Sequence, residues 1–329
     1  MTTFLDLGAS FLRILAILFC LTISAEGQSR ERCGPLIVDV LFGEPISMEM
    51  MIDDLFTARI VYLGEVHTIA RHHSVQAEIL EKLAQRGMKL ALGMEMFGEH
   101  QQAILDQWQS GTESVADLIK NLGSGHWTNL LDYEALLLAA REREVPILCL
   151  NADDHLVRSV ARNGLDALSA AEKERLPSGI LPIDPQYERL LRLRLHVHKA
   201  FQGKSLDNIV IAQAVRDQTM ARALLRFLTS DRGRDRSVLV VAGTGHINYG
   251  FGIPARVEKE LDVPYRIVLP SESGELVLSE AEKRQAIPVE VTHQDLKFIR
   301  QPIADYLHIV PRKSDENEAE PFPYRAGLP

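Results

Sequence analysis

The chain has 329 residues, which suits one large α/β domain or two small ones. Its composition, with 46% apolar residues, 21 glycines and 15 prolines, indicates a globular protein. The formal net charge is −9 and the Lys and Arg residues are scattered along the chain, so nucleic acid is not an expected partner.

The N-terminal segment indicates export. Residues 11–24 (FLRILAILFCLTIS) are apolar but too short for a comfortable membrane span, and the small residues of Ala25-Glu26-Gly27 offer a cleavage point. We therefore interpret 1–27 as an export signal, or as an uncleaved anchor, of a periplasmic or membrane-associated protein. Cys20 would be the lipidated residue of a lipoprotein, although the bulky Phe19 before it departs from that pattern.

The remaining two cysteines give no sign of a metal site. No CxxC pair is present, so a structural zinc site is not expected. Cys149 lies in an apolar run, where a buried small hydrophobic side chain is the simplest interpretation. A disulfide between Cys33 and Cys149 stays open, but the fold does not depend on one.

Apolar runs alternate with segments of helical period from the first folded residues onward. The chain starts with a short strand at 36–42, a turn at 43–45 and a helix opened by Ser47. The β-branched and aromatic run IVYL at 60–63 is typical of a parallel strand buried on both faces. We expect central strands at 60–63, 89–96, 145–150, 237–242 and 265–269. We expect helices at 48–56, 71–85, 99–109, 113–121, 132–144 (with Asp132 as N-cap) and 254–261.

This alternation predicts an α/β fold: a largely parallel sheet flanked by helices in a three-layer sandwich. Residues 153–234 show only helical periods, at 153–162, 169–175, 184–202 and 206–229, and are interpreted as an all-helical insertion or lid. The α/β core then comprises 36–152 and 235–310, with an edge strand at 276–278. The charged, proline-rich run at 311–329 has little to bury and is expected to be a disordered tail.

Acidic, amide and imidazole side chains follow four of the predicted strands. Glu65 and His67 follow the first, Glu95 ends the second, Asn151 follows the third and His246 follows the fourth. The carboxyl ends of parallel strands meet at one edge, so these side chains are expected to share a cleft. Glu and His together can ligate a metal or act as acid and base. Glycines beside them (Gly64, Gly93, Gly243, Gly245) permit tight turns and close approach to a ligand.

Other residues near these strand ends allow a structural or a functional interpretation. His72 and His73 are adjacent on a helix and point about 100° apart, so one is expected to face the cleft and the other solvent. Trp127 either packs on the sheet edge or forms an aromatic wall for a flat ligand. Tyr133 and Tyr249 are either core-edge residues or phenolate ligands of iron. Asp217, beside Arg216, either lies in a surface ion pair or orients a site histidine.

Several motifs, in the expected order over residues 36–270, resemble the ChaN-like family within the wider Tiki/TraB and erythromycin-esterase-like superfamily. They are GEVHTIARHHSVQ, GMEMF, HWTNLLDYEALLLAARER, AVRDQTMA and AGTGHINYGFGIPAR. The resemblance implies an α/β sandwich with a helical insertion. It also implies an exported, often lipid-anchored haem-binding protein associated with iron uptake, which can dimerise around stacked haems with tyrosine ligation.

Superfamily relatives include metal-dependent peptidases and esterases that use a GxxH motif and other strand-end Glu and His residues. In this chain those positions would be Gly64 to His67, Glu95 and His246. The chain departs from the family pattern in two respects: it lacks a convincing lipidation cysteine, and no tyrosine aligns as the haem ligand.

Two main hypotheses follow. In the first, Tyr or His ligates the iron of non-covalently held haem at the strand-end cleft or a homodimer face, Trp127 flanks the ring, and Arg71 or Arg256 pairs with propionates. His72 belongs to the candidate haem contacts. In the second, a hydrolase holds a divalent metal with His67, Glu95 and His246 while Glu65 activates water. Asp217 and Asn151 would support either site from behind; a periplasmic scaffold that binds a partner is the third option.

Overall fold

The computed structural model describes residues 35–123, 127–196, 205–272 and 292–310. The chain divides into two units, residues 1–35 and 36–329, and all described residues except Pro35 belong to the second. The predicted export segment, the edge strand at 276–278 and the tail at 311–329 lie outside the described residues. No helix in the described ranges is long and apolar enough to cross a membrane.

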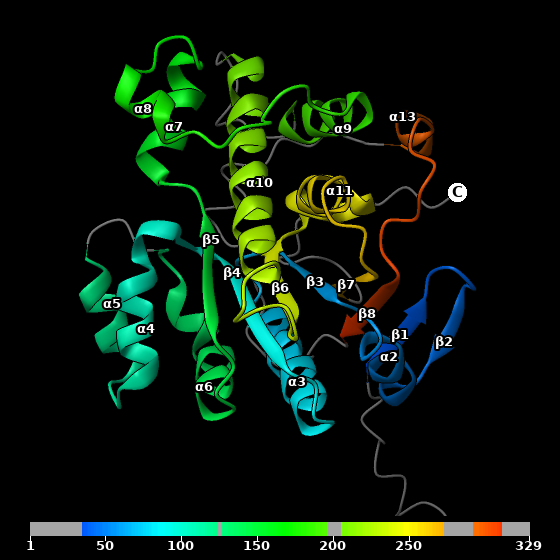
Figure 1. Ribbon diagram of the computed structural model, residues 1–329. Helices are drawn as coiled ribbons and strands as arrows, with labels where there is room; N and C mark the ends of the chain where they lie inside the picture. The colour runs from blue at the N-terminus through cyan, green and yellow to red at the C-terminus, as the bar shows by residue number, and fades with distance from the viewer. Residues whose placement is uncertain (1–34, 124–126, 197–204, 273–291, 311–329) are drawn as a thin grey trace, which may run out of the picture. The chain divides into compact units, whose positions relative to one another are not determined.

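The second unit is built on one eight-stranded sheet with the order β2-β1-β8-β7-β3-β6-β4-β5 (Figure 1). Its five central pairings are parallel, and only the β1–β2 and β1–β8 pairings are antiparallel. The strands are β1 (Leu36–Asp39), β2 (Glu44–Ile46), β3 (Ile60–Glu65), β4 (Leu90–Gly98), β5 (Ile147–Asn151), β6 (Ser237–Gly243), β7 (Tyr265–Glu272) and β8 (Tyr306–Val310).

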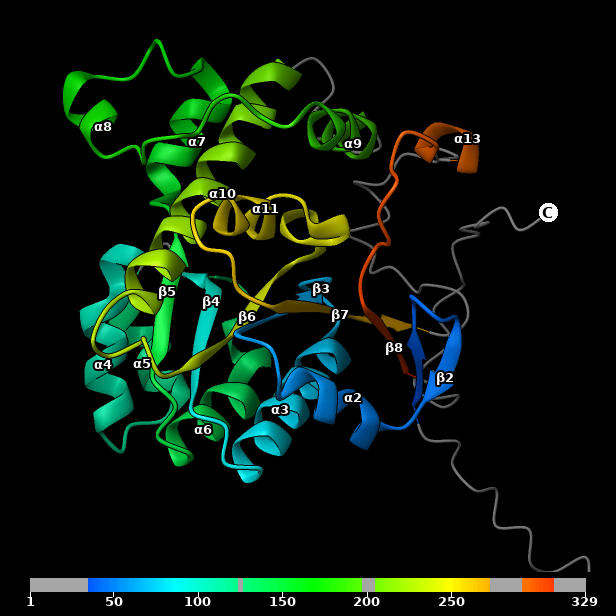
Figure 2. The ribbon, with the colours of Figure 1, turned by 45° about the vertical axis from the view of Figure 1, so that its right-hand side comes forward.

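Helices cover both faces of this sheet, which confirms the predicted α/β fold with three layers (Figure 2). One face packs against α2 (Met48–Leu55), α3 (Ala70–Gln85), α4 (Gln102–Ser110), α5 (Val115–Leu122) and α6 (Glu134–Glu142). The other packs against the C-terminal half of α10 (Leu206–Leu228) and against α11 (Ile253–Glu258). Every residue of β3 is buried, because a central parallel strand is covered on both sides.

The described part of the chain between β5 and β6 consists of helices and the loops that join them. It forms α7 (Asp154–Asn163), α8 (Ala170–Glu174), α9 (Pro185–His196) and α10. The N-terminal half of α10 leaves the sheet and packs with α7 and α9 in two small apolar clusters. That this segment acts as a lid stays a prediction.

Several predicted ends differ from the structure. Asp132 does not cap a helix: a 3₁₀ turn, η2 (Leu130–Tyr133), runs directly into α6. The predicted turn at 43–45 largely belongs to β2, which pairs back onto β1. Neither β8 nor the short α13 (His293–Leu296) was predicted, because β8 is held by β1 and β7, distant partners that a local pattern does not reveal. Ser47 does cap α2, accepting a hydrogen bond from the Met50 amide at 3.1 Å.

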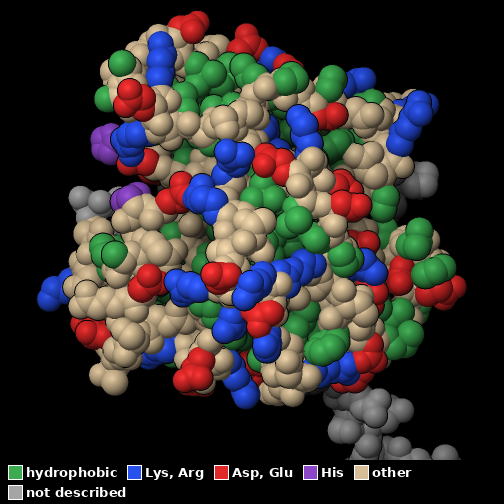
Figure 3. All heavy atoms as spheres, in the orientation of Figure 1, with side chains coloured by type: hydrophobic (Ala, Val, Ile, Leu, Met, Phe, Trp, Pro, Cys, Tyr) green, Lys and Arg blue, Asp and Glu red, His purple; other side chains and the backbone are tan. Residues whose placement is uncertain are grey.

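Charged side chains of both signs are interspersed on the face shown in Figure 3. Lys and Arg gather in no large patch there, and Asp and Glu lie between them. This mixed surface matches the scattered charges of the sequence.

Candidate functional site

The carboxyl ends of β3, β4 and β6 lie side by side and carry predicted site residues. Glu65 ends β3 and is paired with Gly243 at the end of β6. Glu95 lies in β4 where the pairing with β5 changes register, an irregularity of the kind that re-aims side chains. Asn151, at the end of β5, supports this bend by donating from Nδ2 to the Glu95 carbonyl oxygen at 2.9 Å. The strand ends therefore converge as the sequence predicts.

Glu65 is buried, and neighbouring side chains bind both of its carboxylate oxygens. Oε1 accepts hydrogen bonds from Nδ1 of His67, at 2.7 Å, and from the hydroxyl of Tyr133. Oε2 accepts from Nε2 of Gln76 at 2.8 Å, with Nε2 of His73 at 3.6 Å. A buried carboxylate needs such partners, because burying it alone would be costly. Glu65 is thus fixed by α3 and η2, and it in turn fixes the ring of His67.

His67 keeps one ring nitrogen available. Nδ1 is bound to Glu65, so the open position is Nε2. Among the described residues, Nε2 has no hydrogen-bond partner. The side chain is 32% exposed. Burial opposes a charge on the ring, but the hydrogen bond to Glu65 and the charges of Glu95 and Glu65 outweigh it and raise the His67 pKa. The ring is therefore held in place, made more basic, and open at Nε2.

Two neighbours define the space around this nitrogen. The Trp127 ring lies edge-on to the His67 ring, with centroids 4.9 Å apart. A Cβ added at Gly243 would lie 2.7 Å from Nε2 of His67 and 3.6 Å from Oε2 of Glu95. Glycine at this position is therefore what lets the imidazole rest against the end of β6.

His246 forms the second half of the cluster and is in the opposite state. Its Nδ1 lies 2.5 Å from Oδ1 of Asp217, and its Nε2 lies 3.2 Å from Oε1 of Glu95. Burial opposes its charge, but the two carboxylates outweigh burial and raise the His246 pKa to about 10. For Glu95, the neighbouring His246 outweighs burial and holds the carboxyl pKa well below its usual range. His246 is therefore an imidazolium at neutral pH, with both nitrogens engaged.

Further groups hold this ion cluster together. Oε2 of Glu95 accepts from the Gly243 amide at 2.7 Å. The Tyr187 hydroxyl donates to Oδ2 of Asp217, at 2.7 Å, and also lies 3.0 Å from the Gly245 carbonyl oxygen. Nε2 of Gln213 lies 3.0 Å from Nδ1 of His246, a packing contact because both nitrogens carry hydrogens when His246 is an imidazolium. Asp217 is fully buried, so it does not lie in a surface ion pair with Arg216, whose partner is Asp154.

The predicted three-ligand metal site does not form. Within the described ranges, no three His, Cys, Asp or Glu side chains are placed to hold one metal ion. The physical reason is that His246 has no lone pair to offer, since both its nitrogens face carboxylates. The grouping of His67, Glu95 and His246 around a divalent metal is therefore corrected to two carboxylate–imidazole pairs.

One comparison with known proteins decides the family. The family described as haem-binding uptake, Tiki superfamily, ChaN, matches residues 51–257, more than half of the chain. The chain belongs to this ChaN-like family.

One solved structure agrees with the ChaN-like fold. The ChaN of Campylobacter jejuni, described with cofacial haem binding, is 20% identical, with a TM-score of 0.61 over 85% of this chain and 98% of that one. The erythromycin esterase EreC, in an open conformation, is 14% identical, with a TM-score of 0.44 over 69% of this chain and 73% of that one. The first likeness shows the fold.

A curated relative comes from a plant. Protein RETICULATA-RELATED 5, chloroplastic, of Arabidopsis thaliana is 25% identical over 292 residues. The match covers 81% of this chain but 36% of the relative, so the ChaN-like chain spans about a third of that protein's length.

The candidate haem ligands of the ChaN-like chain differ in accessibility. Tyr133 is fully buried and donates its hydroxyl to Glu65, so it is a core residue and not an iron ligand. Tyr249 is half-buried and packs near Phe251, with ring centroids 6.2 Å apart. Tyr249 stays an untested candidate, while His67 presents an unbound nitrogen.

The prediction that one of His72 and His73 faces solvent is wrong, because each is only 2% exposed. Nδ1 of His72 accepts a hydrogen bond from the Val66 amide at 3.1 Å. The His73 ring stacks on Tyr133 at 3.9 Å. Both are packed under the end of β3, where they support the loop that carries His67.

The two arginines proposed for propionates lie in different places. Arg71 is half-buried in the first turn of α3. Arg256 lies on α11 and donates to the carbonyl oxygens of Gly179 and Ile180 and to Gln218. Arg256 is therefore engaged by the segment before α9 and by α10.

Three residues of the cluster were missed: Tyr187, Gln76 and Gln213. Gln76 and Gln213 sit one helical turn from predicted residues (His73 and Asp217), a spacing that could have pointed to them. Tyr187 comes from α9 and carries no signal in the sequence.

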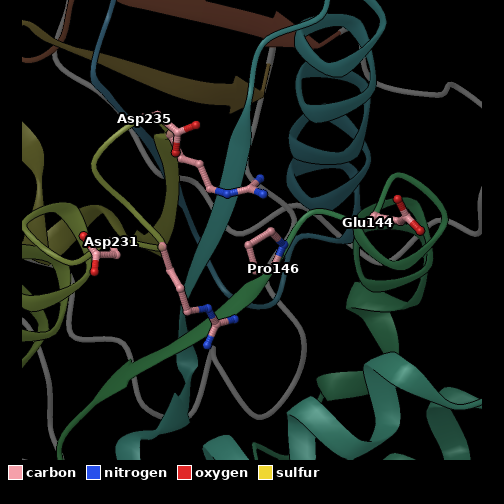
Figure 4. Close-up of a pocket in the computed structure, with 6 residues that line it drawn as sticks. Glu144, Pro146, Asp231 and Asp235 are labelled. Carbon is pink, nitrogen blue, oxygen red and sulfur yellow. The ribbon is translucent and has the colours of Figure 1, made fainter.

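A separate surface pocket of about 400 Å³ lies at the opposite edge of the sheet, where β5 and β6 begin (Figure 4). It is lined by Glu144, Pro146, Asp231, Arg232, Asp235 and Arg236. None of these residues belongs to the strand-end cluster.

Proposed function

We propose that this chain is an exported haem-binding protein associated with iron uptake, and that Nε2 of His67 binds the haem iron. Membership of the haem-binding uptake family supports the ligand. The observation that carries the proposal is the state of His67, whose ring is fixed through Nδ1 by Glu65 and open at Nε2.

The residues around His67 fit a flat, largely apolar ligand. An imidazole nitrogen is a common axial ligand of haem iron, and a carboxylate behind it orients the ring and raises its basicity. Trp127 borders the His67 ring. Val66, just after β3, and Leu131, in η2, expose 42% and 55% of their surfaces. Arg71 stays the candidate partner for a propionate. Bound haem would supply an iron centre; these side chains would hold its ring and exclude water from one face.

Haemin titration tests this assignment. The wild-type protein should give a saturable Soret band, and His67→Ala should weaken haemin binding by more than about tenfold. His155→Ala removes an exposed histidine on α7 and should change nothing. Equal binding by both variants, or loss only in Tyr249→Phe, would move the ligand away from His67.

We further propose that residues 1–27 direct the chain to a membrane or across one, and that two copies pair around facing haems. The apolar segment 11–24 supports the first point, and the cofacial haem described for the Campylobacter protein supports the second. The chloroplastic relative makes a plastid the alternative to the periplasm. An uncleaved chain found only in the cytosol would contradict export, and a haem-loaded monomer in light scattering would contradict pairing.

A hydrolase remains the second candidate because the Glu65–His67 pair also has the geometry of a general base. A carboxylate that orients an imidazole with a free Nε2 can take a proton from water or from a substrate hydroxyl. On this reading, the wild type should cleave p-nitrophenyl acetate faster than His67→Ala, with chelators having no effect. Equal rates would remove this candidate.

A further inference from the structure

A pocket of about 540 Å³ is lined by residues of α9, α10 and α11 and of the segments before α9 and α11. Figure 1 shows where these three helices lie. Its volume is within the range of small-molecule sites. The apolar part of its wall comes from the segment before α9 and from the start of α11. These residues are Leu181, Pro182, Ile183, Pro185, Phe251 and Ala255.

Two cationic side chains, Arg256 and Lys259, line this pocket. The Arg256 guanidinium donates only to neutral acceptors, namely the carbonyl oxygens of Gly179 (3.1 Å) and Ile180 (3.3 Å) and Oε1 of Gln218 (2.6 Å). Lys259, three residues further along, is exposed. Among the described residues, no carboxylate forms an ion pair with either cation. On a chain with net charge −9, two such cations at one pocket stand out.

The two acidic residues of the wall are already engaged. Glu260 lies 3.3 Å from Arg222. Oδ1 of Asp184 accepts hydrogen bonds from the amides of Gln186, at 2.8 Å, and Tyr187, at 3.0 Å. The amide hydrogen bonds do not neutralise Asp184, but with Arg222 counted beside Glu260 the three cations at this wall outnumber its two carboxylates by one.

Tyr187 connects the pocket with the strand-end cluster. Its side chain lines the pocket, and its hydroxyl donates to Asp217 at 2.7 Å. Asp217 in turn binds His246. A ligand seated against Tyr187 would thus touch the outermost member of the ion cluster.

We infer that this pocket is a binding site for a small organic anion that carries an apolar ring or chain. The anionic group pairs with Lys259 and Arg256, and the apolar part lies against the prolines, Leu181 and Phe251. This inference is independent of haem binding at His67.

The probe that tests it is 1-anilinonaphthalene-8-sulfonate, an aromatic anion, compared with its uncharged analogue N-phenyl-1-naphthylamine. Both should bind the wild-type protein with a rise in fluorescence. Lys259→Glu should raise the Kd of the anionic probe at least about fivefold and leave that of the neutral probe nearly unchanged, because only the charge contact is reversed. Lys173→Glu, on the exposed surface of α8, is the matched control.

A second variant tests whether the probes bind in this pocket. Ala255 is exposed on the pocket wall, so Ala255→Trp should fill the space without disturbing the core and weaken both probes. Anion binding that is unchanged in both Lys259→Glu and Ala255→Trp would overturn the inference. So would an equal loss of anion binding in Lys173→Glu, which would indicate general attraction to surface charge.

Discussion

The strand-end cluster holds two imidazoles whose surroundings give them different chemistry. His246 lies between Glu95 and Asp217, so it serves as a fixed positive charge paired with two buried acidic side chains. His67 touches one carboxylate and retains a nitrogen for a ligand. The first imidazole therefore stabilises the site, and the second is the one that can act on something outside the protein.

Glu65→Gln should change His67 without changing its position much, because glutamine has nearly the same shape as glutamate. Removing the charge lowers the His67 pKa, since the hydrogen bond to Glu65 is the largest contribution that raises it. Haemin affinity should fall by about 10- to 100-fold, as for other partners behind a metal-binding histidine. NMR titration of the His67 ring in the haem-free protein reports the pKa directly.

Glu78→Gln, an exposed site on the same helix, is the control and should leave that titration unchanged. An unaltered His67 pKa in Glu65→Gln would mean that the carboxylate does not set the basicity of the ring.

At the residue scale, the sequence predicts which side chains meet but not how they pair. Glu65, Glu95 and His246 follow strands and were expected at one edge on that ground alone. That Asp217 would bind His246 was one of two open readings, because a mid-helix Asp looks the same whether buried or exposed. Both nitrogens of His246 are occupied, at 2.5 Å from Asp217 and 3.2 Å from Glu95. The spacing of residues along the sequence does not reveal these distances.

At the element scale, the predictable parts are those with strong local patterns. β3 and β6 carry continuous apolar runs at 60–63 and 238–242, and α3 and α10 have long helical periods, so each was found close to its true bounds. β2 has three residues, one of them proline, at the edge of the sheet, and β8 is held by β1 and β7. Their pairing partners, and not their own composition, make them strands.

The site also depends on the contacts that hold the loop after β3. The loop after β3 is held by the His72 bond to the Val66 amide and by the bond from Asn129 to the His67 carbonyl oxygen. These contacts come from α3 and from the residues just before η2. One histidine at the start of α3 was expected to face solvent. Instead, both His72 and His73 are buried and support this loop.

For the molecule as a whole, the buried histidines make stability depend on pH in two directions. His246 has a folded pKa of about 10, above its usual 6.5, so its contribution is full below pH 6.5 and is lost as pH rises towards 10. His72 has a folded pKa of about 4, lowered mainly by burial, so its contribution is present above pH 6.5 and is lost as pH falls towards 4.

Urea unfolding of the wild type between pH 7 and 9 should therefore show stability falling with pH, at most by about 1.4 kcal/mol per pH unit from His246. Asp217→Asn lowers the His246 pKa, because it removes one of the two charges that raise it, and so should flatten this slope. His155→Ala should keep the wild-type slope. A wild-type stability that is constant or rises over this range would show that His246 is not charged in the folded protein.

The position of β3 in the sheet has a consequence for how the protein is made. β3 lies between β6 and β7, and Ile60 pairs with Val238 on one side and with Tyr265 on the other. When the growing chain has reached residue 236, neither β6 nor β7 has been made, so β3, which precedes His67, lacks both of its neighbouring strands. Contacts so distant in sequence form slowly, because a long loop must close first. Glu65, His67, Glu95 and His246 can come together only after almost three quarters of the chain has been synthesised, so a partial chain has no assembled site with which to capture a ligand.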